Sequence, residues 1–156
     1  MSIDEEKADG LLVTKFTVCD ADFGVDARLV LEVVKVGELT RVHDAPRGVA
    51  GIRNLRGRIV TVVDTAVHLD LGRVEMGNET RMLIMENQGE AYGFLVDSVT
   101  DAFSLEEEQL GAPPASLDNS LRSKLIGVWR DGDRLTAILD PQSFFQWEAV
   151  SVQPDE

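Results

Sequence analysis

The sequence predicts an all-β protein with minor helices, arranged as β-barrels or as a β-sandwich. Short runs rich in valine, leucine and isoleucine are separated by turn residues at intervals of roughly ten positions, which is typical of antiparallel sheets and not of parallel-sheet folds. Two segments of the chain also repeat one another, which indicates two units of one design. The length of 156 residues is sufficient to bury a core without disulfides or metals.

The first half of the chain contains strands on both sides of a long loop. Residues 11–19 alternate apolar and polar side chains, as expected for a strand with one buried face. Residues 23–36 are predicted to be extended, with a helix over 27–36 as the alternative that the valines disfavour. A strand pair is expected over 51–64, followed by a short helical turn over 66–71.

The second half of the chain contains further strands with the same composition. They are predicted over residues 81–86, 91–96, 97–105, 124–129 and 134–139. A long loop is expected over 106–123, where two prolines and three consecutive glutamates occur. Asp140 is a good helix N-cap and Pro141 suits the first helical position, so a C-terminal helix is expected there. Phe144, Phe145 and Trp147 would bury this helix against the sheets.

The repeated segments define two units of about 70 residues each. Residues 51–64 reappear in similar form at 127–140, and residues 23–36 resemble 92–105. Chance similarity between hairpins is the alternative explanation. The copies differ at the turn, which is Asn-Leu-Arg-Gly at 54–57 and Arg-Asp-Gly-Asp at 130–133. If the units are structural copies, the fold does not require the basic turn, which favours a role in binding over a merely solvated turn.

Charge and cysteine content narrow the class of protein. The net charge of −13, from 28 acidic and 15 basic residues, disfavours binding to nucleic acid or to anionic membranes. Cys19 is the only cysteine, so it cannot form an internal disulfide, and its place in an apparent strand predicts a buried thiol. The first ten residues do not resemble a signal peptide, and no run approaches ~18 apolar residues. We therefore expect a soluble cytoplasmic protein.

No pattern that carries catalytic chemistry is present. The two histidines, His43 and His68, have no metal-ligand spacing, and the sequence contains no hydrolase elbow, zinc-protease motif, phosphate loop or dinucleotide fingerprint. We expect no catalytic residue, no metal and no cofactor. A sheet-rich protein of this kind is most often a binder, because small barrels offer strand edges and grooves to protein partners.

At the turn and the strand after it, the chain resembles the CheW family of chemotaxis coupling proteins. The resemblance rests on Asn-Leu-Arg-Gly at 54–57 with the strand 59–64, on Phe-Gly-Val-Asp at 23–26, on Glu32-Val33, and on Tyr-Gly-Phe-Leu-Val-Asp at 92–97. It extends from about residue 11 to residue 147. Thr61 and the Thr65-Ala66 pair depart from the family pattern, which often has proline at the first position and Leu-Arg at the second.

The resemblance implies a fold of two SH3-like, five-stranded β-barrels packed side by side. One CheW-like domain is expected over 11–147, with a first barrel of roughly 20–75 and a second of roughly 11–19 plus 80–140. These limits are approximate, because the first strand can be exchanged between barrels in the family. The segments 1–10 and 149–156 are expected to be flexible tails.

The resemblance also implies a function without enzymatic activity. Family members are adaptors that couple the cytoplasmic tips of chemoreceptors to a CheA-type histidine kinase, so this chain would work at membrane-associated receptor arrays. Two alternatives remain open: a scaffold of a pilus, gliding or other pathway, and a small-ligand sensor that uses the groove between the barrels.

The family's receptor-facing groove lies between the barrels, and seven positions of this sequence match it. They are Val30, Glu32, Gly51, Asn54, Leu55, Arg56 and Gly57. Glu32 and Arg56 are predicted to form a partly buried ion pair that orients the turn. The kinase is expected on a different, mostly apolar edge, which the sequence does not assign to residues.

Overall fold

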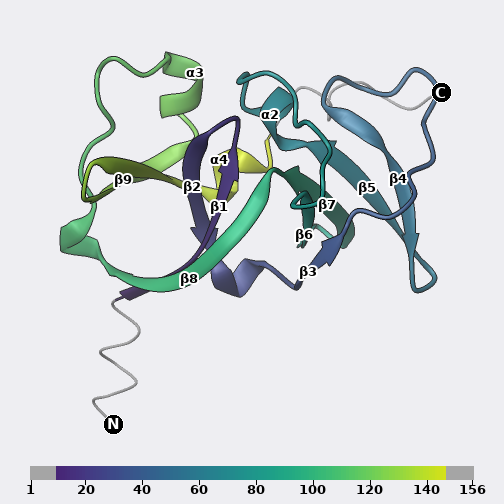
Figure 1. Cartoon of the computed structure of the whole chain (residues 1–156), viewed down its shortest axis with the longest axis horizontal. Helices are drawn as coiled ribbons and strands as arrows, with labels where there is room; N and C mark the ends of the chain where they lie inside the picture. The colour runs from purple at the N-terminus through teal and green to yellow at the C-terminus, as the bar shows by residue number, and fades with distance from the viewer. Residues whose placement is uncertain (1–9, 147–156) are drawn as a thin grey trace, which may run out of the picture.

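The computed structural model describes residues 10–146, which form mostly β strands in two five-stranded units lying side by side (Figure 1). Apart from Gly10, which begins a strand, the predicted tails and Trp147 lie outside the described residues. The strands are β1 (Gly10–Val18), β2 (Ala21–Asp26), β3 (Glu32–Lys35), β4 (Val49–Leu55), β5 (Arg58–Asp64), β6 (Arg81–Asn87), β7 (Glu90–Val96), β8 (Ser98–Glu106), β9 (Leu125–Asp131) and β10 (Arg134–Leu139). The helices are short: η1 (Ala27–Leu29), α2 (Thr65–His68), η2 (Glu107–Gln109), α3 (Asn119–Arg122) and α4 (Pro141–Phe144).

Each unit is a sheet whose two edges are brought together. The first barrel has the strand order β3-β6-β7-β5-β4, and the second has the order β8-β1-β2-β10-β9. In the first barrel, Thr40 on the segment after β3 bridges to Ile52 of β4, at the opposite edge of the same sheet. In the second, Gly111 after β8 bridges to Val128 of β9. The predicted all-β fold of two small barrels is confirmed.

The strand membership of the barrels differs from the expected division. β2 lies in the second barrel, whereas β6 and β7 lie in the first. The reason is local, because β1 and β2 are joined by the two-residue turn Cys19-Asp20, and β6 and β7 by Gln88-Gly89. All four turn residues have positive φ, the pattern of a tight hairpin whose strands remain paired. The strands that cross between barrels are β3, which follows β2, and β8, which follows β7.

The duplication in the sequence is present in the backbone pairing. The five strands of the first barrel correspond in order to those of the second, and each barrel contains one parallel pair, β5 with β7 and β10 with β2. Thr61 lies beside Tyr92 in the first barrel, and the equivalent Ala137 lies beside Phe23 in the second. The two barrels are therefore structural copies with the same register.

The main core extends from the first barrel across the seam between the barrels. Phe94 of β7 lies 4.7 Å from Phe144 of α4, measured between ring centroids. The Asp140 carboxylate caps α4 by accepting from the backbone N–H of Gln142, as the sequence predicted. His68 of α2 donates from Nε2 to the carbonyl oxygen of Phe144 at 2.6 Å, which ties α2 to α4. A smaller cluster fills the second barrel, formed by Val13, Leu105 and Ile138.

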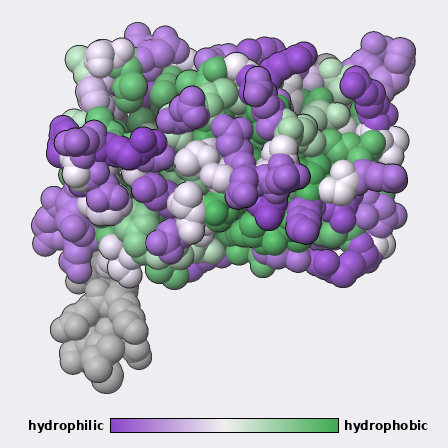
Figure 2. Space-filling view, viewed as in Figure 1, coloured by the Kyte–Doolittle hydropathy of each residue, from purple (hydrophilic) through white to green (hydrophobic). Residues whose placement is uncertain are grey.

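Three local predictions were wrong. Cys19 is exposed and lies in the β1–β2 turn with φ of 50°, so its thiol is not buried. The segment 23–36 is neither one strand nor a helix, because the η1 turn separates β2 from β3. The predicted loop 106–123 contains η2 and α3. Within 10–146 no helix is long and apolar enough to span a membrane, and hydrophilic side chains alternate with apolar patches over the face in Figure 2.

Candidate functional site

The turn between β4 and β5 presents an arginine on an unusual backbone. Arg56 and Gly57 are the two turn residues, and both have positive φ, 52° and 87°. This is the pattern of a type I′ hairpin turn, in which glycine or asparagine normally occupies such positions. The Asn54 side-chain oxygen accepts from the backbone N–H of Gly57 at 2.8 Å, which helps to hold the turn. A non-glycine residue in this conformation costs on the order of 1 kcal/mol, so the Arg56 side chain requires a separate explanation.

The structure brings Glu32 and Arg56 together. The Arg56 guanidinium donates to the Glu32 carboxylate, which links the edge strand β3 to the tip of the hairpin. The pair was expected to be partly buried, but the Arg56 side chain is 65% exposed and that of Glu32 is 37% exposed. An exposed pair contributes only about 0.5 kcal/mol to stability. Its effect is therefore to restrict where the guanidinium points.

The other arginines near the turn are held by neighbouring elements. Arg58 donates to Glu86 of β6 at 2.5 Å and to the Gly89 carbonyl at 3.2 Å, so it connects the β4–β5 hairpin to the β6–β7 hairpin. Arg53 donates to the carbonyls of Lys35 and Val36. Of these three arginines, Arg56 is the one at the hairpin tip, and the one hydrogen bond of its side chain in the described structure goes to Glu32.

The remaining predicted site residues differ in accessibility. Asn54 and Gly57 are exposed beside Arg56, whereas Val30 and Leu55 are half-buried against the core. Gly51 is buried, and a Cβ at this position would lie 2.6 Å from the carbonyl oxygen of Thr40. Gly51 therefore permits the close approach that closes the barrel, and it offers no side chain to a partner.

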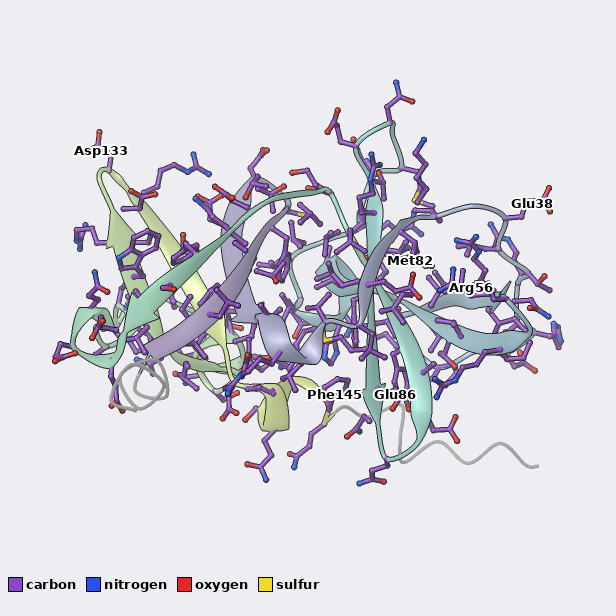
Figure 3. All side chains as sticks on the ribbon, turned by 90° about the horizontal axis from the view of Figure 1, so that it is seen from below. Glu38, Arg56, Met82, Glu86, Asp133 and Phe145 are labelled. Atoms are coloured by element: carbon purple, nitrogen blue, oxygen red, sulfur yellow. The ribbon has the colours of Figure 1, made fainter. Side chains whose placement is uncertain are left out.

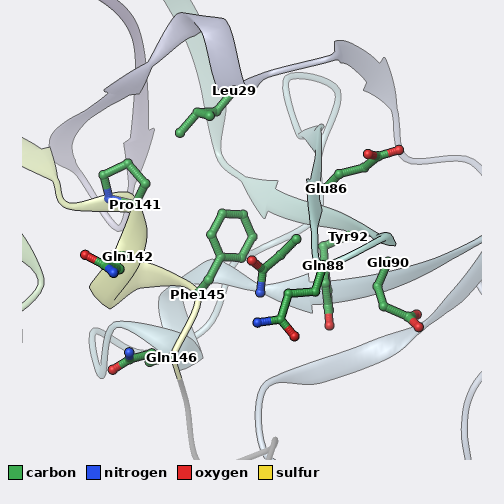
Figure 4. Close-up of a pocket in the computed structure, with 10 residues that line it drawn as sticks. Leu29, Glu86, Gln88, Glu90, Tyr92, Pro141, Gln142, Phe145 and Gln146 are labelled. Carbon is green, nitrogen blue, oxygen red and sulfur yellow. The ribbon is translucent and has the colours of Figure 1, made fainter.

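A groove of about 840 Å³ lies at the seam between the barrels (Figure 4). Its walls come from η1, from the β6–β7 hairpin and from α4, and none of the seven predicted residues lines it. Two links lead from the groove toward the predicted residues: Leu29 in the groove precedes Val30 in the sequence, and Glu86 in the groove pairs with Arg58, which follows the turn. Figure 3 shows Glu86 and Phe145 near the middle of the molecule and Arg56 farther along the first barrel.

Sequence reasoning missed the aromatic part of this groove. Tyr92 lies 6.2 Å from Phe145 between ring centroids, although the two residues belong to different barrels in the repeat. Burial, followed by the charge of Glu90, raises the pKa of the Tyr92 hydroxyl, so this group stays protonated at neutral pH. The only sequence signal was that Tyr92 takes the place of Phe23 in the repeat.

The site contains no arrangement that points to metal chemistry. Across residues 10–146, no group of three histidine, cysteine, aspartate or glutamate side chains is placed to hold a metal ion. What the site offers is a groove of mixed polar and apolar lining that includes Tyr92 and Phe145, and, farther along the first barrel, an exposed guanidinium oriented by Glu32. Such a surface suits a protein partner that presents apolar side chains and an acceptor for arginine.

Comparison with known proteins identifies the family. The model of the CheW-like domain matches residues 13–149. The chain belongs to this family. Chemotaxis protein CheW of Helicobacter pylori is 26% identical, over 86% of this chain and 81% of that protein. CheW of Bacillus subtilis is 25% identical over 90% of this chain and 91% of that protein. Protein FrzA of Myxococcus xanthus is 28% identical over 72% of this chain and 70% of that protein. The crystal structure of scaffolding protein TtCheW from Thermoanaerobacter tengcongensis superimposes with a TM-score of 0.77, at 25% identity over 89% and 90% of the chains.

The two departures from the CheW-like pattern are placed differently by the structure. Thr61 is half-buried on β5, where it pairs with Ile52 and Tyr92. Thr65 and Ala66 are both fully buried in α2. The second departure therefore changes the packing beneath α2, and at this position the chain has no exposed side chain that could contact a partner.

Proposed function

We propose that this CheW-like chain is an adaptor that couples the cytoplasmic tips of chemoreceptors to a CheA-type histidine kinase in chemotaxis signalling. The observation that carries the proposal is the family match over residues 13–149. It is supported by the relatives, several of which are chemotaxis proteins, and by the likeness to a scaffolding protein. The chain would act in the cytoplasm at receptor arrays, by binding alone.

The geometry supports a receptor-facing site that includes the seam groove and the hairpin tip. A helical segment lying in the groove would bury apolar side chains against Leu29, Tyr92 and Phe145. Arg56, farther along the first barrel, has donors left after its contact with Glu32, and it would bind a carboxylate or a carbonyl of the partner. Because Glu32 restricts the guanidinium before binding, less conformational freedom is lost on association. The kinase would bind elsewhere on the protein.

The test is co-sedimentation with receptor-containing membranes, combined with autophosphorylation of the kinase in the ternary mixture. Arg56→Ala should lower both receptor co-sedimentation and kinase activation, while the melting temperature stays close to that of the wild type. Arg130→Ala is the matched control, because Arg130 is an exposed arginine of the equivalent hairpin in the second barrel. Equal receptor binding by wild type and Arg56→Ala would refute the assigned site, and absence of binding by the wild type would refute the function.

A scaffold role in another chemosensory pathway is the second candidate. The observation that favours it is that the relatives include protein FrzA, which is not named CheW. Isolation of the tagged chain from its own cells, followed by identification of the co-purified kinase and receptors, distinguishes the two pathways. Recovery of a kinase from a flagellar system would support chemotaxis, and recovery of one from another motility system would support the alternative.

A further inference from the structure

The polar part of the seam groove carries negative charge that nothing in its lining balances. The described residues that line it include two carboxylates, those of Glu86 and Glu90, and four side-chain amides, but no lysine or arginine. Glu86 is already paired with Arg58 at 2.5 Å. The Glu90 side chain is exposed and forms no ion pair or hydrogen bond with any residue that the structure describes. The groove therefore offers one carboxylate to a partner.

Glu90 lies beside the aromatic wall of the groove. Glu90 and Tyr92 are two positions apart on β7, so their side chains point to the same face of the sheet. Figure 4 shows them side by side, and Phe145 of α4 lies 6.2 Å from Tyr92 between ring centroids. The charge of Glu90 is also a cause, after burial, of the raised pKa of the Tyr92 hydroxyl. A carboxylate next to an aromatic ring suits a lysine or arginine, whose charge pairs with the carboxylate while its apolar stem packs on the ring.

The second barrel shows what the fold requires at these two positions. Tyr92 and Phe23 occupy the same place in the parallel ladders of the two barrels, and two positions earlier Glu90 corresponds to Ala21. Neither Ala21 nor Phe23 has a polar side-chain group, and Phe23 is only 1% exposed. The strand therefore forms without a carboxylate or a hydroxyl at these places. Both groups occur in the copy that lines the groove, which favours a role in binding over a merely solvated carboxylate.

We propose that the receptor segment bound in the seam groove presents a lysine or arginine to Glu90 and Tyr92, while its apolar side chains pack against Leu29 and Phe145. This inference rests on the proposed function and adds the chemistry that the receptor segment carries. Arg56, farther along the first barrel, binds an acceptor of the same segment. Opposite charges at two separate places set the direction in which the segment lies, because a reversed segment would bring like charges together.

Charge reversal at Glu90 tests the proposal by co-sedimentation of the full-length chain with receptor-containing membranes. Glu90→Lys should weaken receptor binding at least about ten-fold, because it places a like charge against the cation of the receptor. Glu90→Gln removes only the attraction and should weaken binding about three-fold. Glu108→Lys is the matched control, because Glu108 is an exposed glutamate of η2 on the second barrel and the change in net charge is the same. It should stay within about two-fold of the wild type. All three variants should keep the wild-type melting temperature, since both glutamates are exposed.

A complementary change on the receptor completes the test. In soluble cytoplasmic fragments of the receptor, each lysine and arginine of the tip is changed singly to glutamate. One of these changes should weaken binding to the wild type and restore binding to Glu90→Lys, which a merely structural effect at Glu90 would not do.

The outcomes separate this inference from the proposed function. Equal receptor binding by Glu90→Lys and Glu108→Lys, or the absence of any restoring change, would overturn the inference. So would loss of kinase binding by Glu90→Lys with receptor binding unchanged, because the kinase would then occupy the groove. If Arg56→Ala still loses receptor binding in these cases, the proposed function stands without the inference. If the wild type does not bind receptor, both fail.

Discussion

In the first barrel the β4–β5 hairpin turns through Arg56 and Gly57, whereas in the second barrel the equivalent β9–β10 hairpin turns through Gly132 and Asp133. The first turn position has positive φ in both, 52° at Arg56 and 64° at Gly132. The second barrel uses the residue that tolerates this backbone best, and the first uses one that is strained there. Because the same fold forms with glycine, the turn does not require an arginine, which supports the proposed binding role of its side chain.

The two barrels also use one shared position of the repeat in different ways. Arg58 and Arg134 are equivalent, but Arg58 pairs with Glu86 at the surface, whereas Arg134 forms two bonds, of 2.6 and 2.9 Å, with Asp22. Asp22 is only 5% exposed. The second barrel therefore uses its arginine to satisfy a buried charge. The first uses its arginine to connect two hairpins beside the seam groove, which is part of the proposed binding site.

The largest difference between the barrels in the stability lost on substitution is expected at a pair of equivalent buried glycines. A Cβ at Gly24 would lie 2.4 Å from a methyl of Val13, whereas at Gly93 it would lie 2.9 Å from the sulfur of Met82. Valine is stiff and methionine adapts its conformation, so Gly24→Ala should lower the free energy of unfolding by about 3 kcal/mol and Gly93→Ala by about 1 kcal/mol. Urea unfolding of both variants measures the difference, and equal losses would contradict this account.

The next largest effect on stability is expected from removing the buried charge of Asp22 in the second barrel. Asp22→Asn removes a carboxylate that accepts from Arg134 and lies 3.9 Å from the Lys15 ammonium, and should lower the free energy of unfolding by about 2 kcal/mol. Glu86→Gln in the first barrel is the control, because it removes an exposed pair and should cost about 0.5 kcal/mol or less. If the two variants have equal stability, burial does not distinguish the two arginines.

The same carboxylate predicts a pH dependence. The hydrogen bonds from Arg134 hold the pKa of Asp22 below its usual value, against the opposing effect of burial. A depressed folded-state pKa contributes stability that is complete above the unfolded value of about 3.9 and is lost as the pH falls through the folded pKa. Unfolding free energies from pH 7 down to pH 3 should therefore fall less steeply for Asp22→Asn than for the wild type. Parallel curves would show that the pKa of Asp22 does not differ between the folded and unfolded states.

The sequence was sufficient to predict the strands, their duplication and the residues of the basic turn. Periodicity and turn residues are local signals, and a repeat is visible without structure. The placement of β2 in the second barrel and of β6 and β7 in the first was missed, because it depends on which hairpins stay paired and not on composition. The seam groove was missed for a related reason, since Tyr92 and Phe145 are 53 positions apart and meet only through tertiary packing.

The smallest effect on stability, and the sharpest test of the comparison, comes from exchanging the residues of the two turns. Arg56→Gly relieves the backbone strain at the turn but removes the exposed pair with Glu32, so the free energy of unfolding should change by less than about 1 kcal/mol. Gly132→Arg places a side chain on a positive-φ position without an arranged partner and should cost about 1 kcal/mol. Thermal and urea unfolding measure both changes.

Partner binding should separate the two variants in the opposite order. Arg56→Gly should lose receptor co-sedimentation despite its nearly unchanged stability, and Gly132→Arg should retain it despite its lower stability. Gly132→Ala in the second barrel controls for strain alone, because it changes the backbone preference without adding charge. Loss of receptor binding by Gly132→Arg would show that the second hairpin also contacts the receptor, and the division of roles between the barrels would then be wrong.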